Sequence, residues 1–142
     1  MKVKDIMTSP AIHISPNESV EVAARTLAHY NIGVLPVCNG NGTLCVMVTD
    51  RDLVIRCVAA NKEPGKTTVA DIMTGQVHYA NPEMETGVAA HYMGRCQVRR
   101  LPVVENGKLC GMVSLGDIAC REDMVMDAAD ALSDITGNIS DR

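Results

Sequence analysis

The chain of 142 residues repeats its own sequence, and this repeat constrains the fold more than any other feature. The sequence V-K-D-I-M-T that begins at Val3 returns 66 positions later as V-A-D-I-M-T, beginning at Val69. After a loop that is one residue longer in the first copy, the offset is 65, and Leu44-Cys45 corresponds to Leu109-Cys110. A repeat of this size is typical of a supersecondary unit that buries its apolar face against its copy, so we predict a tandem duplication.

Apolar periodicity and turn residues predict the same order of elements in each copy: strand, helix, strand, strand, helix, which is an α+β fold. In the first copy these elements are expected at 11–14, 19–30, 34–38, 44–48 and 50–60. In the second copy they are expected at 77–80, 86–96, 101–105, 108–113 and from 115 onward. We therefore assign the first repeat to 1–60, a linker to 61–68, the second repeat to 69–121 and an acidic C-terminal helix to 122–142.

The C-terminal segment has apolar and acidic residues at helical spacing. The expected apolar face consists of Val125, Ala128, Ala129, Leu132 and Ile135. Most of the acids fall on the other face, among them Asp123, Asp127, Asp130 and Asp134. This helix packs either on its own core or on a partner chain, and the pattern fits both.

Each repeat ends its last strand in a hydroxyl residue that is followed three positions later by an aspartate: Thr49 and Asp52, then Ser114 and Asp117. Such a pattern is an ordinary helix N-cap. It also places unpaired N–H groups and a positive helix end beside a hydroxyl, which is an arrangement that binds phosphate. The aspartates would repel phosphate but accept hydrogen bonds from ribose hydroxyls. The duplication of the pattern favours a nucleotide site.

Composition excludes several other functions. Residues 122–142 carry six acids and one arginine, so the rest of the chain is close to neutral and has no excess of positive charge for nucleic acid. Without Phe or Trp it also has no aromatic platform for stacked bases. No apolar stretch is long enough to cross a bilayer, and the N-terminus does not resemble a signal peptide. We expect a cytoplasmic protein that does not bind membranes.

The six cysteines contain no C-x-x-C pair and lie mostly within apolar runs, which indicates thiols packed in the core. Four histidines offer a different interpretation, because His13 and His78 fall at nearly equivalent places in the repeats. With His29, His91 and the cysteines they would supply ligands for a metal or redox sensor. No tight ligand cluster is evident from the spacing, so no metal ligand is assigned.

With these motifs in this order, twice, the chain resembles a tandem pair of CBS domains, called a Bateman module. The motifs that carry the resemblance are the opening D-I-M-T, the strands N-I-G-V-L-P-V and Q-V-R-R-L-P-V, and the ends V-M-V-T-D-R-D and G-M-V-S-L-G-D. The resemblance covers residues 1 to about 121. The resemblance implies that the repeats pack as a pseudo-twofold pair with two clefts that bind AMP, ADP, ATP or S-adenosylmethionine, and that two pairs associate as a homodimer.

The resemblance also implies roles for particular residues. Thr49 and Ser114 would contact phosphate, and Asp52 and Asp117 the ribose. The adenine would be enclosed by Ile14, Ser15, Ala80, Asn81, Pro36 and Pro102, with apolar neighbours. Arg99 and Arg100 match basic positions that bind phosphate tails. Apart from the resemblance, Arg51 and Arg56 are candidate local phosphate partners for the first-repeat site.

Two departures from the family pattern favour the site in the second repeat. The glycine that begins the last motif is present as Gly111 but is replaced by Val46 in the first repeat. Opposite Arg99 and Arg100 the first repeat has Gly33 and Val34, so only one repeat has a basic lining.

The expected function is therefore a regulatory module that binds an adenosine nucleotide and is read by another protein. It needs no cofactor, and since the sequence contains no P-loop, dinucleotide fingerprint or nucleophile–base spacing, we expect no enzyme activity. The alternatives are the metal or redox sensor and a dimerisation scaffold with empty clefts.

Overall fold

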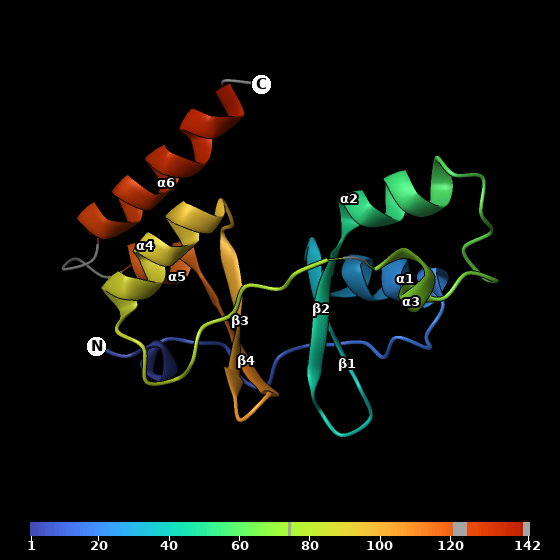
Figure 1. The fold of residues 1–142 in the computed structure, drawn as a ribbon, viewed down its shortest axis with the longest axis horizontal. Coiled ribbons are helices and arrows are strands. Elements are labelled where there is room, and N and C mark those ends of the chain that lie inside the picture. Colours follow the sequence, from blue (N-terminus) through green and yellow to red (C-terminus); the bar gives the residue numbers. More distant parts are fainter. Residues whose placement is uncertain (74, 121–124, 141–142) are drawn as a thin grey trace. The chain divides into compact units, whose positions relative to one another are not determined.

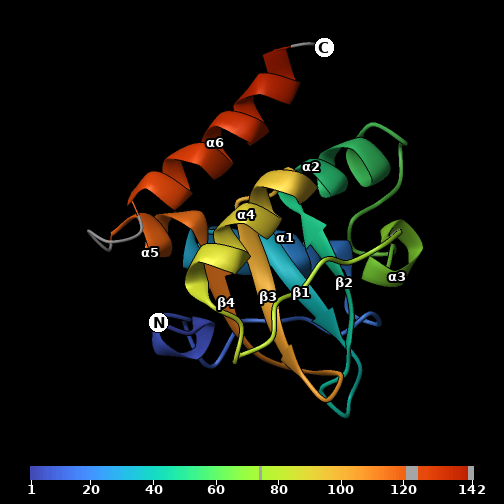
Figure 2. The same ribbon diagram turned by 60° about the vertical axis from the view of Figure 1, so that its left-hand side comes forward.

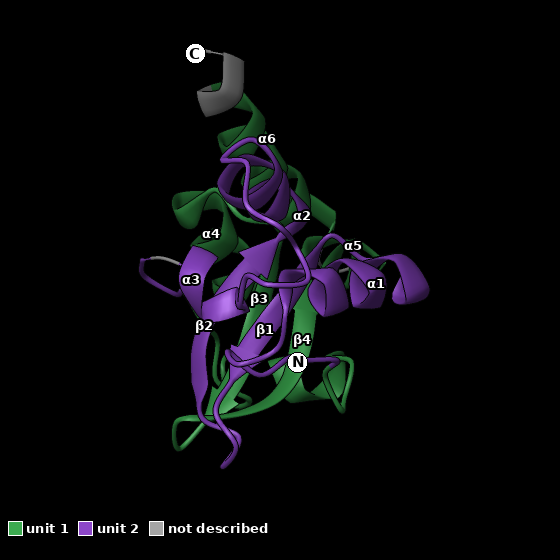
Figure 3. Cartoon of the chain, turned by 90° about the vertical axis from the view of Figure 1, so that its right-hand side faces the viewer, with its two compact units in different colours: residues 1–11, 78–142 green, residues 12–77 purple. Residues whose placement is uncertain are grey.

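The computed structural model describes residues 1–73, 75–120 and 125–140, with side chains up to residue 137. The chain forms two compact units, shown in different colours in Figure 3. Unit 1 contains residues 1–11 and 78–142, and unit 2 contains residues 12–77. The compact units therefore differ from the sequence repeats, because each repeat contributes its opening segment to the unit that holds the body of the other.

Unit 2 is built around the antiparallel hairpin of β1 (Val34–Cys38) and β2 (Leu44–Thr49). Helix α1 (Val20–Tyr30) precedes the hairpin (Figure 1). After β2 come α2 (Asp50–Leu53), the π-helical turn η2 (Val54–Val58) and the short helix α3 (Val69–Ile72). The predicted helix over 50–60 is thus a short α-helix that continues as a π-helical turn.

Helix α3 comes from the second repeat but belongs to the core of unit 2. The amide of Val69 donates to the carbonyl of Glu18 (2.8 Å), and that of Ala70 donates to the carbonyl of Pro16 (2.9 Å). Val69 and Ile72 are buried with the apolar side chains of α1, β1 and β2. Residues 61–68, predicted as a linker, carry the chain into this contact.

Unit 1 has the same plan around β3 (Arg100–Glu105) and β4 (Lys108–Ser114), which pair antiparallel. Asn106 and Gly107 form the predicted tight turn, and both have positive φ (54° and 79°), which is typical of a two-residue hairpin. The unit also contains the 3₁₀ turn η1 (Val3–Asp5), α4 (Thr86–Cys96), α5 (Leu115–Ala119) and α6 (Val125–Ser140), visible from a second side in Figure 2.

The N-terminal segment packs on the second repeat within unit 1. Val3 is fully buried in the core of this unit, and its amide donates to the carbonyl of Met84 (2.8 Å). Thr8 forms an antiparallel bridge with Met112, with N···O distances of 2.8 and 2.9 Å. Nearby, the carboxylate of Glu83 accepts hydrogen bonds from two lysines of the segment, Lys2 and Lys4. These hydrogen bonds lower the pKa of Glu83 to about 2.

The strands predicted at 11–14 and 77–80 are each only one bridged residue. Ile14 bridges Val37 and Ala80 bridges Val103, both in parallel. Two residues after each bridge stands a proline, Pro16 in the first repeat and its equivalent in the second. Because proline has no N–H to donate to a ladder, each pairing stops there.

Helix α6 packs along α4 and α5 of unit 1, which confirms packing on the chain's own core (Figures 1 and 2). Its buried residues are Ala128, Ala131 and Ile135. The predicted face is wrong in part, because Val125, Ala129 and Leu132 are exposed whereas Ala131 is fully buried. Ala131 lies against Gly94 of α4: a Cβ added to Gly94 would be only 3.1 Å from the Cα of Ala131. These two small residues let the helices approach closely. Of the acids predicted on the opposite face, Asp123 lies outside the described residues.

Within the described ranges, no helix combines the length and the apolar character that crossing a bilayer requires.

Candidate functional site

The hydroxyl and aspartate pairs that end the two repeats form capping boxes. In unit 1 the amide of Asp117 donates to Ser114 Oγ (3.0 Å), and the amide of Ser114 donates to Asp117 Oδ2 (3.0 Å). In unit 2 the corresponding distances between Asp52 and Thr49 are 3.1 and 2.9 Å. The N-cap interpretation is therefore confirmed in both repeats. Each cap uses only one carboxylate oxygen and the acceptor side of the hydroxyl, so the hydroxyl hydrogen is left to donate elsewhere.

The start of α2 does not match the free helix end that a phosphate site requires. The amide of Asp50 donates to the carbonyl of Gly33 (2.9 Å), and that of Arg51 donates to Asp50 Oδ1 (2.8 Å). The third amide, of Asp52, is used by the cap. All three amides at the start of α2 therefore already have acceptors, and a carboxylate lies beside them.

The start of α5 differs in two ways. Its first residue is the apolar Leu115, where unit 2 has the acidic Asp50. The amide of Leu115 donates to the carbonyl of Arg99 (2.8 Å), as that of Asp50 donates to the carbonyl of Gly33. The amide of the exposed Gly116 has no acceptor within the described part of the chain. With only five residues α5 has a weak macrodipole, so a bound anion here would depend on specific donors rather than on the helix.

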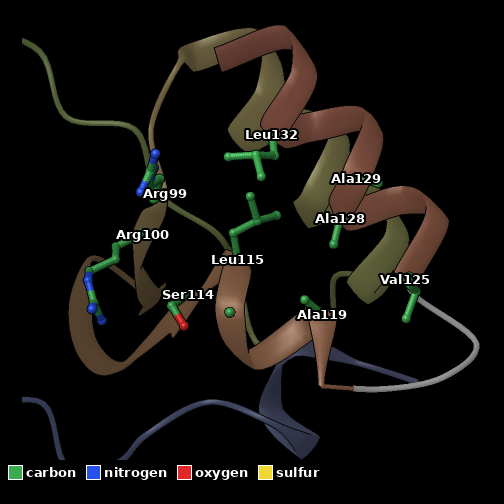
Figure 4. Close-up of a pocket in the computed structure, with 10 residues that line it drawn as sticks. Arg99, Arg100, Ser114, Leu115, Ala119, Val125, Ala128, Ala129 and Leu132 are labelled. Atoms are coloured by element: carbon green, nitrogen blue, oxygen red, sulfur yellow. The ribbon is translucent and has the colours of Figure 1, made fainter. Parts of the chain in front are cut away.

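Such donors lie next to a pocket of about 500 Å³ in unit 1. Figure 4 shows Arg99, Arg100 and Ser114 at one end of it, and Ala119 and Val125 at the other. The described residues that line the pocket are Arg99, Arg100, Ser114, Leu115, Gly116, Ala119, Val125, Ala128, Ala129 and Leu132. The structure therefore brings three predicted site residues together, two arginines and Ser114. The predicted ribose partner Asp117 lies in the first turn of α5 but does not line this pocket.

The equivalent region of unit 2 has the opposite electrostatic character. Gly33 and Val34 stand where unit 1 has its two arginines, and a Cβ added to Gly33 would lie 3.5 Å from Asp50 Oδ2. A phosphate here would meet the carboxylate of Asp50, with no arginine at the positions equivalent to Arg99 and Arg100. This difference supports the ranking of the second-repeat site above the first.

Ile14 and Ser15 line a different pocket, of about 380 Å³, in unit 2. Thr49 and Asp52 do not line this pocket. The pocket lies between α1 and the loop that joins β1 to β2. Its described lining is His13, Ile14, Ser15, Glu18, Val22, Thr26, Cys38, Asn39, Gly40 and Gly42.

The remaining predicted residues around adenine lie close to the sheet. Pro36, Pro102 and Ala80 are buried, and the backbone of Ala80 is held by hydrogen bonds to the carbonyl of Pro102 (3.0 Å) and the amide of Val104 (2.8 Å). Asn81 is exposed, and its Oδ1 accepts the amide of Glu83 (3.0 Å). Their contact with a base stays a prediction.

Of the two arginines suggested for the first repeat, Arg56 already has partners in unit 2. Its Nε lies 3.9 Å from Asp52 Oδ1, and its Nη1 donates to the carbonyl of Ile72 (3.1 Å). Arg56 therefore lies beside the aspartate that was expected to face a ribose. Arg51 is exposed.

The cysteines and histidines do not form a metal centre within the described residues, where no three His, Cys, Asp or Glu side chains come together. His78 pairs with the Tyr92 hydroxyl (3.3 Å), and His91 Nε2 lies 2.9 Å from Asp127 Oδ1. Cys38 and Cys57 are buried as predicted, whereas the prediction is wrong for Cys120, which is exposed; the other three cysteines are half-buried. Burial raises the pKa of the Cys38 thiol. A raised pKa keeps the thiol protonated and unreactive.

Sequence reasoning missed the part that α6 plays in the pocket of unit 1. Four of the ten lining residues belong to this helix: Val125, Ala128, Ala129 and Leu132. The pattern identified them as one apolar face, but a face that is buried and a face that lines a pocket have the same periodicity.

Comparisons with known proteins agree with the fold. The CBS domain pattern matches residues 3–58 and 69–122. The CBS domain-containing protein YhcV of Bacillus subtilis is 37% identical over 134 residues, which cover 94% of each chain.

Two solved structures are similar at 30% identity. Hypoxic Response Protein I, with two coordinated zinc ions, has a TM-score of 0.78 and covers 85% of this chain and 98% of its own. The CBS domain pair of protein MJ0100, in complex with 5-methylthioadenosine and S-adenosyl-L-methionine, has a TM-score of 0.73 with coverages of 84% and 94%. The matched ranges take in both repeats, so the chain belongs to the CBS domain family and carries two CBS domains in tandem.

Proposed function

We propose that the protein is a non-catalytic regulatory module that binds an adenosine nucleotide through the second CBS repeat. Arg99, Arg100 and the Ser114 hydroxyl hold the phosphate, and the exposed amide of Gly116 adds a backbone donor. The carboxylate oxygen of Asp117 that the cap leaves unused accepts the ribose hydroxyls. The observation that carries the proposal is the pocket whose lining includes Arg99, Arg100 and Ser114.

Two further observations support this assignment. Guanidinium groups bind phosphate in a bidentate manner, and the first repeat has neither arginine at the equivalent positions. In addition, a CBS pair of similar structure binds adenosine derivatives, namely 5-methylthioadenosine and S-adenosyl-L-methionine.

The geometry of the capping box argues against catalysis by Ser114. Asp117 accepts a hydrogen bond from the amide of Ser114, not from its hydroxyl, so the two side chains are not arranged as a nucleophile and its base. Occupancy instead shifts the protein between conformations that a partner protein reads.

A second copy of the chain is the partner that we propose for the module itself. Three apolar side chains of η2 are exposed: Val54 (56%), Ile55 (46%) and Val58 (62%). Neighbouring exposed aliphatic residues on one helix are typical of an interface, which supports a homodimer.

The test is calorimetric titration and thermal unfolding with AMP, ADP, ATP, S-adenosylmethionine and NAD, with GMP as a control. Ligand at a hundred times its dissociation constant should stabilise the protein by about 2.7 kcal/mol per site. The double variant Arg99→Gln, Arg100→Gln should lose most of this response.

Lys108→Gln is the matched control, because it removes a positive charge from the far end of β4, about 20 Å along the strand from Ser114. It should bind as the unmodified protein does. Equal affinity of the double variant and the control for the best ligand would contradict the phosphate role of the arginines, and a flat response to every adenosine compound would refute the proposed function.

A further inference from the structure

The pocket of unit 1 extends well beyond the groups that a phosphate requires. Apart from the arginines, Ser114 and Gly116, its described lining consists only of aliphatic side chains: Leu115, Ala119, Val125, Ala128, Ala129 and Leu132. Four of these six come from α6, which begins after residue 122, where the CBS match ends. The aliphatic wall is therefore built mainly by a helix that is not part of the CBS repeat.

This wall is partly open to solvent, since Leu115 and Ala128 are buried but other wall residues are not. Leu132 is 41% exposed and Val125 is 48% exposed, and Leu132 and Leu115 point toward one another across the pocket in Figure 4. The wall side chains carry no hydrogen-bonding group with which to recognise the edge of a base or a sugar hydroxyl. An aliphatic chain needs no such group, and it would gain free energy by covering these side chains.

The charge of the pocket is confined to its other end. Among the described lining residues only Arg99 and Arg100 are charged, and they lie with Ser114 away from Ala119 and Val125 (Figure 4). Two guanidinium groups and a hydroxyl favour a carboxylate or phosphate head group. The volume, about 500 Å³, is within the range of pockets that bind small molecules.

We propose that this pocket binds an anionic amphiphile as a free monomer: one aliphatic chain along α6 with its carboxylate or phosphate head group at Arg99 and Arg100. The site shares the arginines with the proposed nucleotide function but does not depend on it, because the chain is bound by residues that the nucleotide does not use.

Calorimetric titration of the full chain with decanoate and decyl phosphate, below their micellar concentrations, tests the proposal. We expect one ligand per chain. Affinity should rise about threefold to fourfold per methylene group from hexanoate through octanoate to decanoate, as expected for burial of an alkyl chain. Decan-1-ol, which has no charge, should bind at least about tenfold more weakly, since it cannot form the charged hydrogen bonds.

Two substitutions on α6 separate the pocket from the rest of the helix. Leu132→Gln places an amide on the aliphatic wall and should weaken decanoate binding by about tenfold or more. Met126→Gln is its matched control: Met126 is 72% exposed on the same helix and does not line the pocket, so decanoate affinity should be unchanged. Glutamine is a good helix former in both places.

Three outcomes would overturn the proposal: no decanoate binding, affinity that does not depend on chain length, or equal effects of the two substitutions. Titration of the Leu132→Gln variant with AMP distinguishes the two proposals. If the Leu132→Gln variant binds AMP with unchanged affinity but no longer binds decanoate, the aliphatic wall is separate from the nucleotide site. If the unmodified protein binds decanoate but not AMP, only the nucleotide function is refuted.

Discussion

Replacing Gly111 by valine gives the second repeat the residue that the first repeat has at Val46, and the structure predicts that this change releases the N-terminal segment. A Cβ at Gly111 would lie 2.7 Å from Met7 Sδ and 2.9 Å from the carbonyl oxygen of Thr8. The sulfur belongs to a flexible side chain, but the carbonyl is backbone. The segment must therefore move away from β4.

The cost follows from the contacts that hold the segment there. The bridge between Thr8 and Met112 contributes two hydrogen bonds, and Ser9 Oγ donates a third to the carbonyl of Cys110 (2.8 Å). Each of these hydrogen bonds contributes about 1 kcal/mol, and some of them break when the segment moves. Together with the cost of overpacking, we expect the free energy of unfolding to fall by about 2–4 kcal/mol. In a chain of this size that lowers Tm by about 10 °C.

Urea unfolding and amide hydrogen exchange measure the two consequences. The Gly111→Val variant should unfold at lower urea concentration, and the amide of Thr8 should exchange faster while amides within α1 of unit 2 keep their protection. Gly40→Ala is the control, because a Cβ there meets no atom within 4 Å. Unchanged stability and unchanged protection of Thr8 in the Gly111→Val variant would refute the reasoning.

Four further predictions address other parts of the molecule. The two lysine hydrogen bonds lower the pKa of Glu83 to about 2, so the contribution of Glu83 to stability is present above the unfolded pKa near 4.5 and is lost as the pH falls toward 2. Glu83→Gln should therefore flatten the plot of Tm against pH in this range. Ser114→Ala and Thr49→Ala should each cost about 1 kcal/mol of unfolding free energy through the lost cap, but calorimetry should show weaker nucleotide binding only for the former. Ala131→Leu overpacks the contact between α4 and α6 and should cost about 1–3 kcal/mol in urea unfolding; the same stability as the unmodified protein would mean that the helices are not closely packed. Val58→Glu places a charge on the exposed apolar surface of η2 and should convert a dimer to monomers in light scattering, and an unaltered mass would place the interface elsewhere.

Local sequence determined much of this protein. The offset of 66 identified two copies of one unit, and most helices and strands lie close to where periodicity placed them, including α4 at 86–96. Both capping boxes followed from three-residue spacing alone, because a cap is a bond between near neighbours. The arginines that distinguish the second repeat were also readable as a difference between two aligned copies.

Tertiary structure decided what those residues do. Only the fold places Val3 in the core of the second repeat and Val69 in that of the first, because nothing local in either segment states which hydrophobic surface will bury it. At the start of α2 the amide of Arg51 donates to Asp50 Oδ1, whereas the equivalent amide of Gly116 in α5 has no acceptor in the described part of the chain, and the three-residue spacing could not show this difference. The apolar face of α6 was evident from periodicity, but Gly94 decides which side approaches α4, and that leaves Leu132 to line a pocket instead of a core.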